Sequence, residues 1–168
     1  KKFQFTLNPT LLYEYDSISR LSEYFSNLNV SQEHKSFVLL PTQKAFYSNQ
    51  VFYPESPCNS LVKITFEKQL DSLLLQKSWD FLSRKHESLR LMFEMTDNGP
   101  EQSVADFSSV KIEYLKIENK TDSAELIYDI ENKMLHRVYQ LDRYPLYDLC
   151  YVEIGQSDSV LIFNAHHI

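Results

Sequence analysis

The alternation of apolar and polar residues predicts a series of helices and strands from residue 37 onward. Apolar residues at helical spacing predict helices, and short continuous or alternating apolar runs predict strands. In chain order, the expected elements are a helix over 41–50, a strand over 61–66, a helix over 71–88, strands over 89–95, 104–107 and 111–117, a helix over 122–139, and strands over 146–154 and 160–166. This order predicts an α+β fold, a mixed sheet with helices packed on one face.

The last expected strand ends on two adjacent histidines. An apolar run, Val160–Phe163, follows a turn at Gly155 and continues to His166 and His167. Because neighbouring side chains of a strand point to opposite faces, we expect His166 to face the core and His167 to face a cleft. Two side chains that point apart cannot readily bind one ion. No set of Cys, His and Glu at ligand spacing accompanies them in the sequence, so no metal site is expected.

The opening of the chain has a pattern of its own. Residues 1–29 contain one apolar stripe at helical spacing after Asp16, a residue type suited to cap a helix. The polar residues that follow predict a linker over 30–36. We therefore divide the chain into these two segments and a second folded unit over 37–168.

Composition and charge narrow the class of protein. The 168 residues carry a formal net charge of −6 and no block of Lys and Arg, so nucleic acid is not an expected partner. The chain has 2 glycines, too few for a glycine-rich phosphate loop. Cys58 and Cys150 stand alone without CxxC spacing, which predicts unreactive thiols in a reducing compartment. No apolar stretch has the length of a membrane span, so we expect no membrane contact and a cytoplasmic location.

Three short motifs occur in the second unit. They are LPTQKAFY over 40–47, KHESLRLMF over 85–93, and the region from Pro145 that ends in Ala-His-His-Ile at Ile168. They are similar to the motifs LxPxQxxxW/F, RHExLRTxF and PL…LxxHHxxxDG, with Lys and Leu replacing Arg and Thr in the second. Each motif is short, but together and in this order they resemble the N-terminal lobe of a condensation domain of nonribosomal peptide synthetases.

This resemblance implies a fold like that of chloramphenicol acetyltransferase, with two α+β lobes and a tunnel between them. It implies a donor acyl or peptidyl thioester on an upstream carrier domain and an acceptor amine on a downstream carrier domain. The second histidine of the motif assists amide formation, which makes His167 the candidate catalytic residue. The candidate supporting residues are His166, Arg90, His86, Glu87 and Gln43.

The resemblance also implies that other parts of the enzyme lie outside this chain. The Asp and Gly of HHxxxDG and the C-terminal lobe would follow Ile168, so we expect the isolated chain to be inactive. Residues 1–29 resemble the end of a carrier domain, whose 4′-phosphopantetheine attachment serine would precede Lys1. The chain itself is expected to bind no cofactor directly.

Several alternatives remain open from the sequence. An epimerization domain also follows a carrier domain and shares the HH pair, whereas a heterocyclization domain would replace the pair with aspartates and is disfavoured. A non-catalytic lobe that only docks carrier domains is a further alternative, and so is a hybrid synthetase that also contains polyketide synthase modules. A neutral imidazole suits proton transfer near neutral pH, but His167 could instead position the amine. For His86 and Glu87, a role at a helix end is favoured over an acid/base pair.

Overall fold

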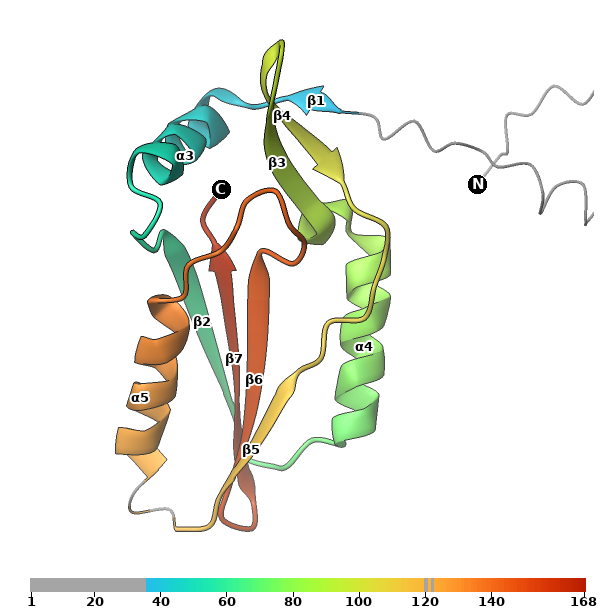
Figure 1. Cartoon of the computed structure of the whole chain (residues 1–168). Coiled ribbons are helices and arrows are strands. Elements are labelled where there is room, and N and C mark those ends of the chain that lie inside the picture. Colours follow the sequence, from blue (N-terminus) through green and yellow to red (C-terminus); the bar gives the residue numbers. More distant parts are fainter. Residues whose placement is uncertain (1–35, 120, 122) are drawn as a thin grey trace, which may run out of the picture. The chain divides into compact units, whose positions relative to one another are not determined.

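A four-stranded sheet forms the centre of the described chain, which comprises residues 36–119, 121 and 123–168 of a computed structural model (Figure 1). The strand order is β2-β7-β6-β5. The strands are β2 (Asn59–Phe66), β5 (Glu113–Ile117), β6 (Tyr147–Ile154) and β7 (Asp158–His166). β7 pairs antiparallel with β2 and β6, whereas β5 pairs parallel with β6, so the sheet is mixed as predicted. The unit predicted over 1–29 and the linker up to Lys35 lie outside the described residues.

Helices cover both faces of this sheet. Along β6, Cys150 and Val152 pack with α5 (Ser123–Leu135), whereas Leu149 and Tyr151 belong to the cluster that includes α4 (Ser72–Lys85). The predicted placement of the helices on one face was therefore wrong. Every residue of β6 and β7 is buried or half-buried, as expected of strands that are covered on both sides. α5 also connects β5 to the parallel β6, and a crossover helix of this kind covers one face of the sheet.

The buried face of α5 contains Ile127 where the sequence pattern predicted Leu126. The pattern placed Leu126, Ile130, Met134 and Val138 on one buried face. In the structure Ile127 and Met134 are buried and Ile130 packs against them, whereas Leu126 is exposed and Val138 follows the end of the helix.

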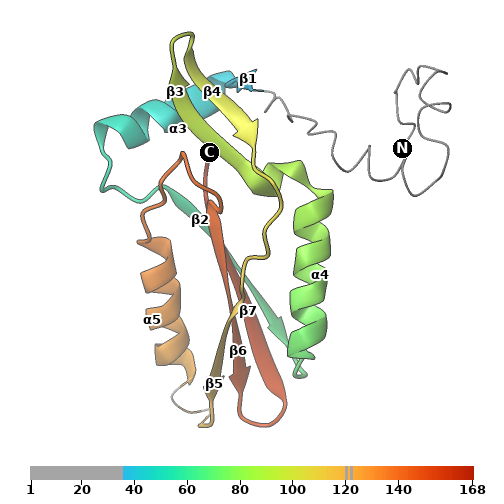
Figure 2. The ribbon, with the colours of Figure 1, turned by 45° about the vertical axis from the view of Figure 1, so that its right-hand side comes forward.

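A smaller three-stranded sheet has the order β1-β4-β3 (Figure 2). Its strands are β1 (Phe37–Val38), β3 (Leu91–Thr96) and β4 (Gly99–Val104), and a short 3-10 helix, η1 (Glu87–Arg90), leads into β3. The expected strand over 104–107 was misplaced, because β4 begins directly after the Asp97-Asn98 turn. Pairing of Thr96 with Gly99 across this tight turn fixes the register of the hairpin. Gly99 has a φ of +106°, which favours glycine.

Helix α3 (Pro41–Phe52) begins where the sequence predicts, with proline in its first turn. The Oε1 atom of Gln43 accepts a hydrogen bond of 2.9 Å from the backbone N–H of Leu40 and so caps the start of the helix. The buried residues of α3 are Gln43, Tyr47 and Gln50, which lie four and three positions apart on one face. This inward face carries polar groups, and Gln50 contacts His166 at the end of β7.

The β6–β7 hairpin follows the predicted turn closely. Gly155 has a φ of +60°, a left-handed conformation in which glycine avoids the strain of a Cβ atom. Its N–H donates to the carbonyl of Ile117 over 2.8 Å, so the turn is also tied to β5. Among the described residues, no helix is long and apolar enough to cross a membrane.

Candidate active site

The extended backbone continues one residue beyond the end of β7. The N–H of His166 donates to the carbonyl of Leu146 over 2.9 Å, and the N–H of His167 donates to the carbonyl of Cys58 over 2.8 Å. Consecutive N–H groups therefore bind chain segments on opposite sides of β7, which is the geometry of a strand. The side chains consequently alternate, and His166 is 8% exposed whereas His167 lies at the surface. The sequence predicted this separation.

The hydrogen bonds of His166 define its tautomer. Its Nδ1 atom lies 3.2 Å from the N–H of Ile168, which can only donate, so Nδ1 is an acceptor and Nε2 carries the proton. Nε2 lies 3.2 Å from Oε1 of Gln50, while the amide nitrogen of Gln50 donates to the carbonyl of Pro54 over 2.8 Å. The carbonyl of Pro54 thus orients Gln50, and Gln50 orients the imidazole.

Burial also determines the charge of His166. Desolvation, followed by the proximity of His167, lowers the pKa of His166 from 6.5 to about 4. Its imidazole is therefore neutral near pH 7 and fully used in hydrogen bonds. This environment suits a residue that fixes the end of β7 rather than one that exchanges protons.

His167 has the opposite environment. Its ring stands edge-on to the ring of Phe46 on α3, with centroids 4.8 Å apart and an interplanar angle of 86°. This contact restricts the orientation of the imidazole. Neither ring nitrogen makes a hydrogen bond to any residue of the described chain. An external reacting group can therefore reach a nitrogen without breaking an internal contact.

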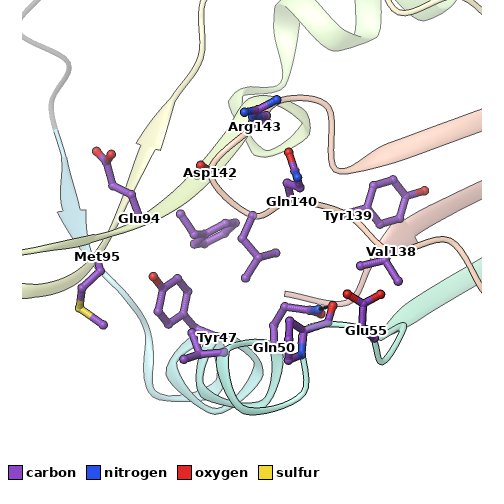
Figure 3. A pocket seen from close by; sticks show the side chains of 14 residues that line it. Tyr47, Gln50, Glu55, Glu94, Met95, Val138, Tyr139, Gln140, Asp142 and Arg143 are labelled. Atoms are coloured by element: carbon purple, nitrogen blue, oxygen red, sulfur yellow. Dashed lines mark hydrogen bonds between the residues drawn. The ribbon is translucent and has the colours of Figure 1, made fainter.

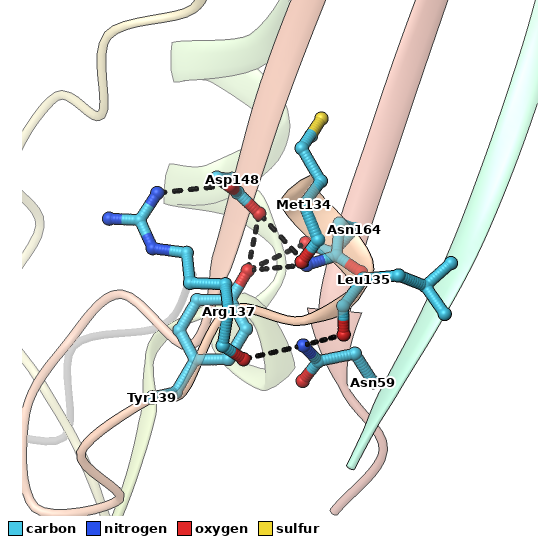
Figure 4. Close-up of polar contacts among 7 residues, drawn as sticks. All are labelled: Asn59, Met134, Leu135, Arg137, Tyr139, Asp148 and Asn164. Carbon is cyan, nitrogen blue, oxygen red and sulfur yellow. Dashed lines mark hydrogen bonds and ion pairs between the residues drawn. The ribbon is translucent and has the colours of Figure 1, made fainter. Parts of the chain in front are cut away.

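A polar network fixes β7 two residues before His166 (Figure 4). Asn164 is fully buried, and its amide donates to the carbonyl of Met134, the hydroxyl of Tyr139 and the carboxylate of Asp148, at 2.8, 2.9 and 3.1 Å. The hydroxyl of Tyr139 also donates to Asp148, and Arg137 forms an ion pair of 2.9 Å with the same carboxylate. The network joins the end of α5 to β6 and β7. Burial, and next the hydrogen bond to Asp148, raise the pKa of Tyr139, so its hydroxyl keeps its proton.

The other residues singled out in the sequence lie away from the histidine pair. Gln43 caps α3 and donates to the side chain of Gln102 over 3.0 Å. Arg90 donates to the carbonyl of Ser83 over 3.0 Å and to the carbonyl of Ala105. His86 and Glu87 are exposed at the junction of α4 and η1, where the backbone of His86 closes the helix. The geometry thus groups His166 and His167, whereas Gln43, Arg90 and the backbone of His86 make structural contacts elsewhere.

Sequence reasoning missed two residues that contact the histidines, Phe46 and Gln50. Both belong to the predicted first helix, but nothing local connects them with β7. The available signal was the polar stripe of Gln43, Tyr47 and Gln50 at helical spacing. A stripe of this kind indicates that the inward face of the helix makes hydrogen bonds rather than purely apolar contacts.

The two cysteines differ in burial and in their relation to this site. Cys150 is fully buried, and desolvation, followed by the charge of Glu113, raises the pKa of its thiol to about 12. Cys58 contributes its backbone carbonyl to His167, and both thiols are free. Within the described ranges, no group of three His, Cys, Asp or Glu side chains could hold a metal ion.

Comparison with known proteins identifies the family. The sequence profile of the condensation domain matches residues 33–168. The chain belongs to the condensation-domain family. It is 23% identical over 166 residues to surfactin synthase subunit 1 of Bacillus subtilis, covering 94% of this chain and 4% of that protein. It is also 21% identical over 126 residues to bacitracin synthase 2 of Bacillus licheniformis, covering 75% of this chain and 5% of that protein.

Solved condensation domains share the fold. The first condensation domain of the calcium-dependent antibiotic synthetase superposes with a TM-score of 0.75 at 16% identity, over 80% of this chain and 33% of the other. The starter condensation domain of rhizomide synthetase RzmA gives a TM-score of 0.73 at 17% identity, over 79% and 34%. The α+β lobe and the resemblance to a condensation domain are therefore confirmed. The chain spans about a third of these domains and 4–5% of the curated relatives.

Proposed function

We propose that this chain is the first lobe of a condensation domain that forms an amide between a carrier-bound acyl or peptidyl thioester and a carrier-bound amine. The observation that carries the proposal is the contrast between the two histidines. His166 is buried and neutral, whereas His167 presents unoccupied ring nitrogens at the same strand end. Membership of the condensation-domain family supports amide formation as the reaction class.

In this reaction the amine nitrogen attacks the thioester carbonyl, the C–N bond forms and the C–S bond breaks. The proton lost by the amine must leave, and the departing thiolate must gain one. We assign to the imidazole of His167 the tasks of holding the amine and accepting its proton. The edge-on contact with Phe46 supports this role because it restricts the direction of the ring nitrogens. His166, Arg90, His86, Glu87 and Gln43 have supporting roles in this proposal.

The remaining parts of the reaction come from other domains in this proposal. Residues 1–29 form the end of an upstream carrier, followed by a linker over 30–36 and the lobe over 37–168. The alignment with surfactin synthase subunit 1 supports this organisation, because its 94% coverage extends beyond residues 33–168. Upstream and downstream carriers bring substrates on 4′-phosphopantetheine, and a C-terminal lobe provides the other tunnel wall. A cytoplasmic location stays a prediction.

The decisive experiment uses a synthetase that contains this lobe, its C-terminal lobe and both loaded carriers. We expect His167→Ala to reduce the rate of amide formation by about 100- to 10,000-fold, the range of general acid–base contributions. The matched control is His136→Ala, because His136 is exposed on the turn after α5, where its ring binds the carbonyl of Asn132. Product is measured by mass spectrometry of peptide released from the downstream carrier.

Each of the other outcomes would change the assignment of the residue or of the function. An unchanged rate in His167→Ala would remove the catalytic assignment while leaving amide formation intact. A mixture of D and L products on the upstream carrier, without a new amide, would favour an epimerization domain. Carrier binding without any product in the unsubstituted protein would favour a non-catalytic docking lobe.

A further inference from the structure

A pocket of about 630 Å³ opens between α3, β3 and the segment 138–143 (Figure 3). None of the buried side-chain atoms that lack a hydrogen-bond partner within the described chain belongs to its lining. A continuous row of unpaired polar groups lies instead along the outer edge of β2, where the groups belong to the backbone. This edge, rather than the pocket, therefore offers binding groups to a partner.

β2 is an edge strand of the four-stranded sheet (Figure 1). Its inner side pairs with β7 along all 8 residues, and no strand of the described chain pairs with its outer side. β2 contains no proline, and no bulge interrupts its register with β7. Edge strands usually carry such features, because a regular unpaired edge accepts a strand of another chain.

The pairing with β7 determines which backbone groups of β2 point outward. The N–H of His167 donates to the carbonyl of Cys58, so the even-numbered residues of β2 bind β7 through their backbone. In an antiparallel ladder the residues between them direct both backbone groups to the other side. The outward groups are therefore the N–H and C=O of Leu61, Lys63 and Thr65.

The charge of Lys63 does not protect this edge. A lysine on an edge strand usually keeps other strands away, because its charge would have to be desolvated in the contact. The ammonium of Lys63 instead lies 2.6 Å from the carboxylate of Glu131 on α5. The Glu131 side chain is 20% exposed, so the ion pair is partly shielded from water. The pair neutralises Lys63 on one face of the sheet and leaves the edge open.

The sequence of β2 is complementary to itself. When two copies of β2 pair antiparallel about Lys63, Val62 of each copy lies beside Ile64 of the other. These are non-hydrogen-bonded pairs, in which facing side chains approach most closely, and both side chains are about half exposed in the single chain. In the same register Leu61 faces Thr65 of the other copy, and every outward N–H and C=O gains a partner.

We propose that the outer edge of β2 is a self-association surface, whose occupant is the β2 strand of a second copy of this chain. A second copy fits this edge because the backbone groups and the apolar contact are both complementary about one two-fold axis. The two Lys63 side chains then face each other, which is tolerated because each is paired with Glu131. The proposal concerns assembly, so it holds or fails independently of the role of His167.

The test is hydrogen exchange of the backbone amides, measured by NMR on the full chain at increasing protein concentration. We expect exchange at Leu61, Lys63 and Thr65 to slow as the concentration rises, in parallel with dimer formation in sedimentation velocity. The amides of Val62 and Ile64 already bind β7, so their exchange should change little. A contact between two sheet faces would not produce this alternation along β2.

Thr65→Pro removes one outward N–H from each copy without removing a hydrogen bond to β7. It should weaken association about tenfold. Thr65→Ala is the matched control, because it keeps the N–H and should associate like the unsubstituted chain. Glu131→Gln should weaken association about two- to fivefold, since it leaves the facing Lys63 charges unneutralised.

Glu131→Gln leaves the backbone of β2 unchanged, so it provides a second comparison if Thr65→Pro lowers the melting temperature. Equal association of Thr65→Pro and Thr65→Ala would overturn the proposal. Exchange at Leu61, Lys63 and Thr65 that does not depend on concentration would overturn it as well. Protection that appears only when a C-terminal lobe is present would assign the edge to a strand of the same domain instead of a second copy.

Discussion

His166 and His167 are adjacent in sequence, but their ring nitrogens differ in accessibility. His166 contacts Gln50 and the backbone of Ile168 and is almost inaccessible, whereas the ring nitrogens of His167 make no hydrogen bond to a described residue. This difference follows from strand geometry, since adjacent side chains leave the backbone in opposite directions. One imidazole can therefore stabilise the strand end while the other remains available for chemistry.

The lowered pKa of His166 makes stability dependent on pH. Above pH 6.5 the imidazole is neutral in both the folded and the unfolded chain and contributes no difference. Between pH 6.5 and about 4 the unfolded chain binds the proton more tightly, so stability falls as the pH falls. The full loss is about 3 kcal/mol, from 1.36 kcal/mol per pKa unit.

Urea denaturation at several pH values measures this effect. The free energy of unfolding of His166→Gln should vary less between pH 6.5 and 4 than that of the unsubstituted chain. His136→Gln is the matched control, because His136 is exposed. If the free energy of unfolding varied with pH in the same way in His166→Gln and in the unsubstituted chain, the lowered pKa of His166 would be contradicted.

Substitution of Gln50 offers a second way to shift the protonation equilibrium of His166. In Gln50→Glu a carboxylate would lie near Nε2 of His166, and an opposite charge at that distance favours the imidazolium. We expect the pKa of His166 to rise above about 4, at a stability cost of about 1–3 kcal/mol from the lost donor to Pro54. An NMR titration of the imidazole resonances gives the pKa directly.

Gln69→Glu serves as the control for this titration. Gln69 binds the carbonyl of Gly155 at the opposite end of the sheet, so a charge there should leave His166 unaffected. A pKa of His166 that does not move in Gln50→Glu would show that the hydrogen bond between Gln50 and His166 does not determine its protonation.

The contact with Gln50 illustrates what sequence patterns miss. Alternation predicted the opposite faces of His166 and His167, because that information is local to one strand. Gln50 lies 116 positions earlier, and its approach to His166 depends on how α3 packs over the end of β7. A tertiary contact of this kind has no periodicity in the sequence.

The position of α5 relative to the sheet depends on the polar network around Asp148. Asp148 accepts from Arg137, Tyr139 and Asn164, which lie after α5 and on β7. We expect Asp148→Asn to lower the free energy of unfolding by about 1–3 kcal/mol, because an amide turns one acceptor into a donor that faces other donors. Chemical denaturation provides the measurement.

A matched control for the network lies on α5 itself. Asp129→Asn makes the same chemical change at an exposed position and should alter stability by less than about 0.5 kcal/mol. If both substitutions had the same small effect, the network would be no more than a surface feature. A large loss of stability confined to Asp148→Asn would show that the network holds the end of α5 in place.

The elements were predictable to different degrees. β6, β7 and the turn at Gly155 followed from long apolar runs and a glycine that the turn requires. β4 did not, because GPEQSV has no apolar alternation and becomes a strand only through pairing with β3. The two-sided covering of the sheet also escaped prediction, since the side on which a helix packs depends on connections rather than on its own stripe.

Two apolar side chains on one face of β2 are exposed in the folded unit. Val62 and Ile64 are 50% and 46% exposed and pair with Phe163 and Leu161, so they extend the apolar face beside α4. On α4, Leu74 and Phe81 are also exposed. Apolar side chains that are exposed side by side on one strand face, as Val62 and Ile64 are, typically mark a surface that another protein surface covers.

When this chain is studied alone, we expect a second copy to cover the patch, so that sedimentation velocity shows association that increases with concentration. The double variant Val62→Glu/Ile64→Glu should shift the equilibrium toward monomer, because each glutamate would have to be desolvated in the contact. Thr65→Glu introduces a charge on the same strand, but Thr65 lies on the opposite face with Leu61, so it should associate like the unsubstituted chain. Equal association of the double variant and the unsubstituted chain would show that the contact lies elsewhere, whereas a monomer at all concentrations would show that the patch is too small to hold a second copy.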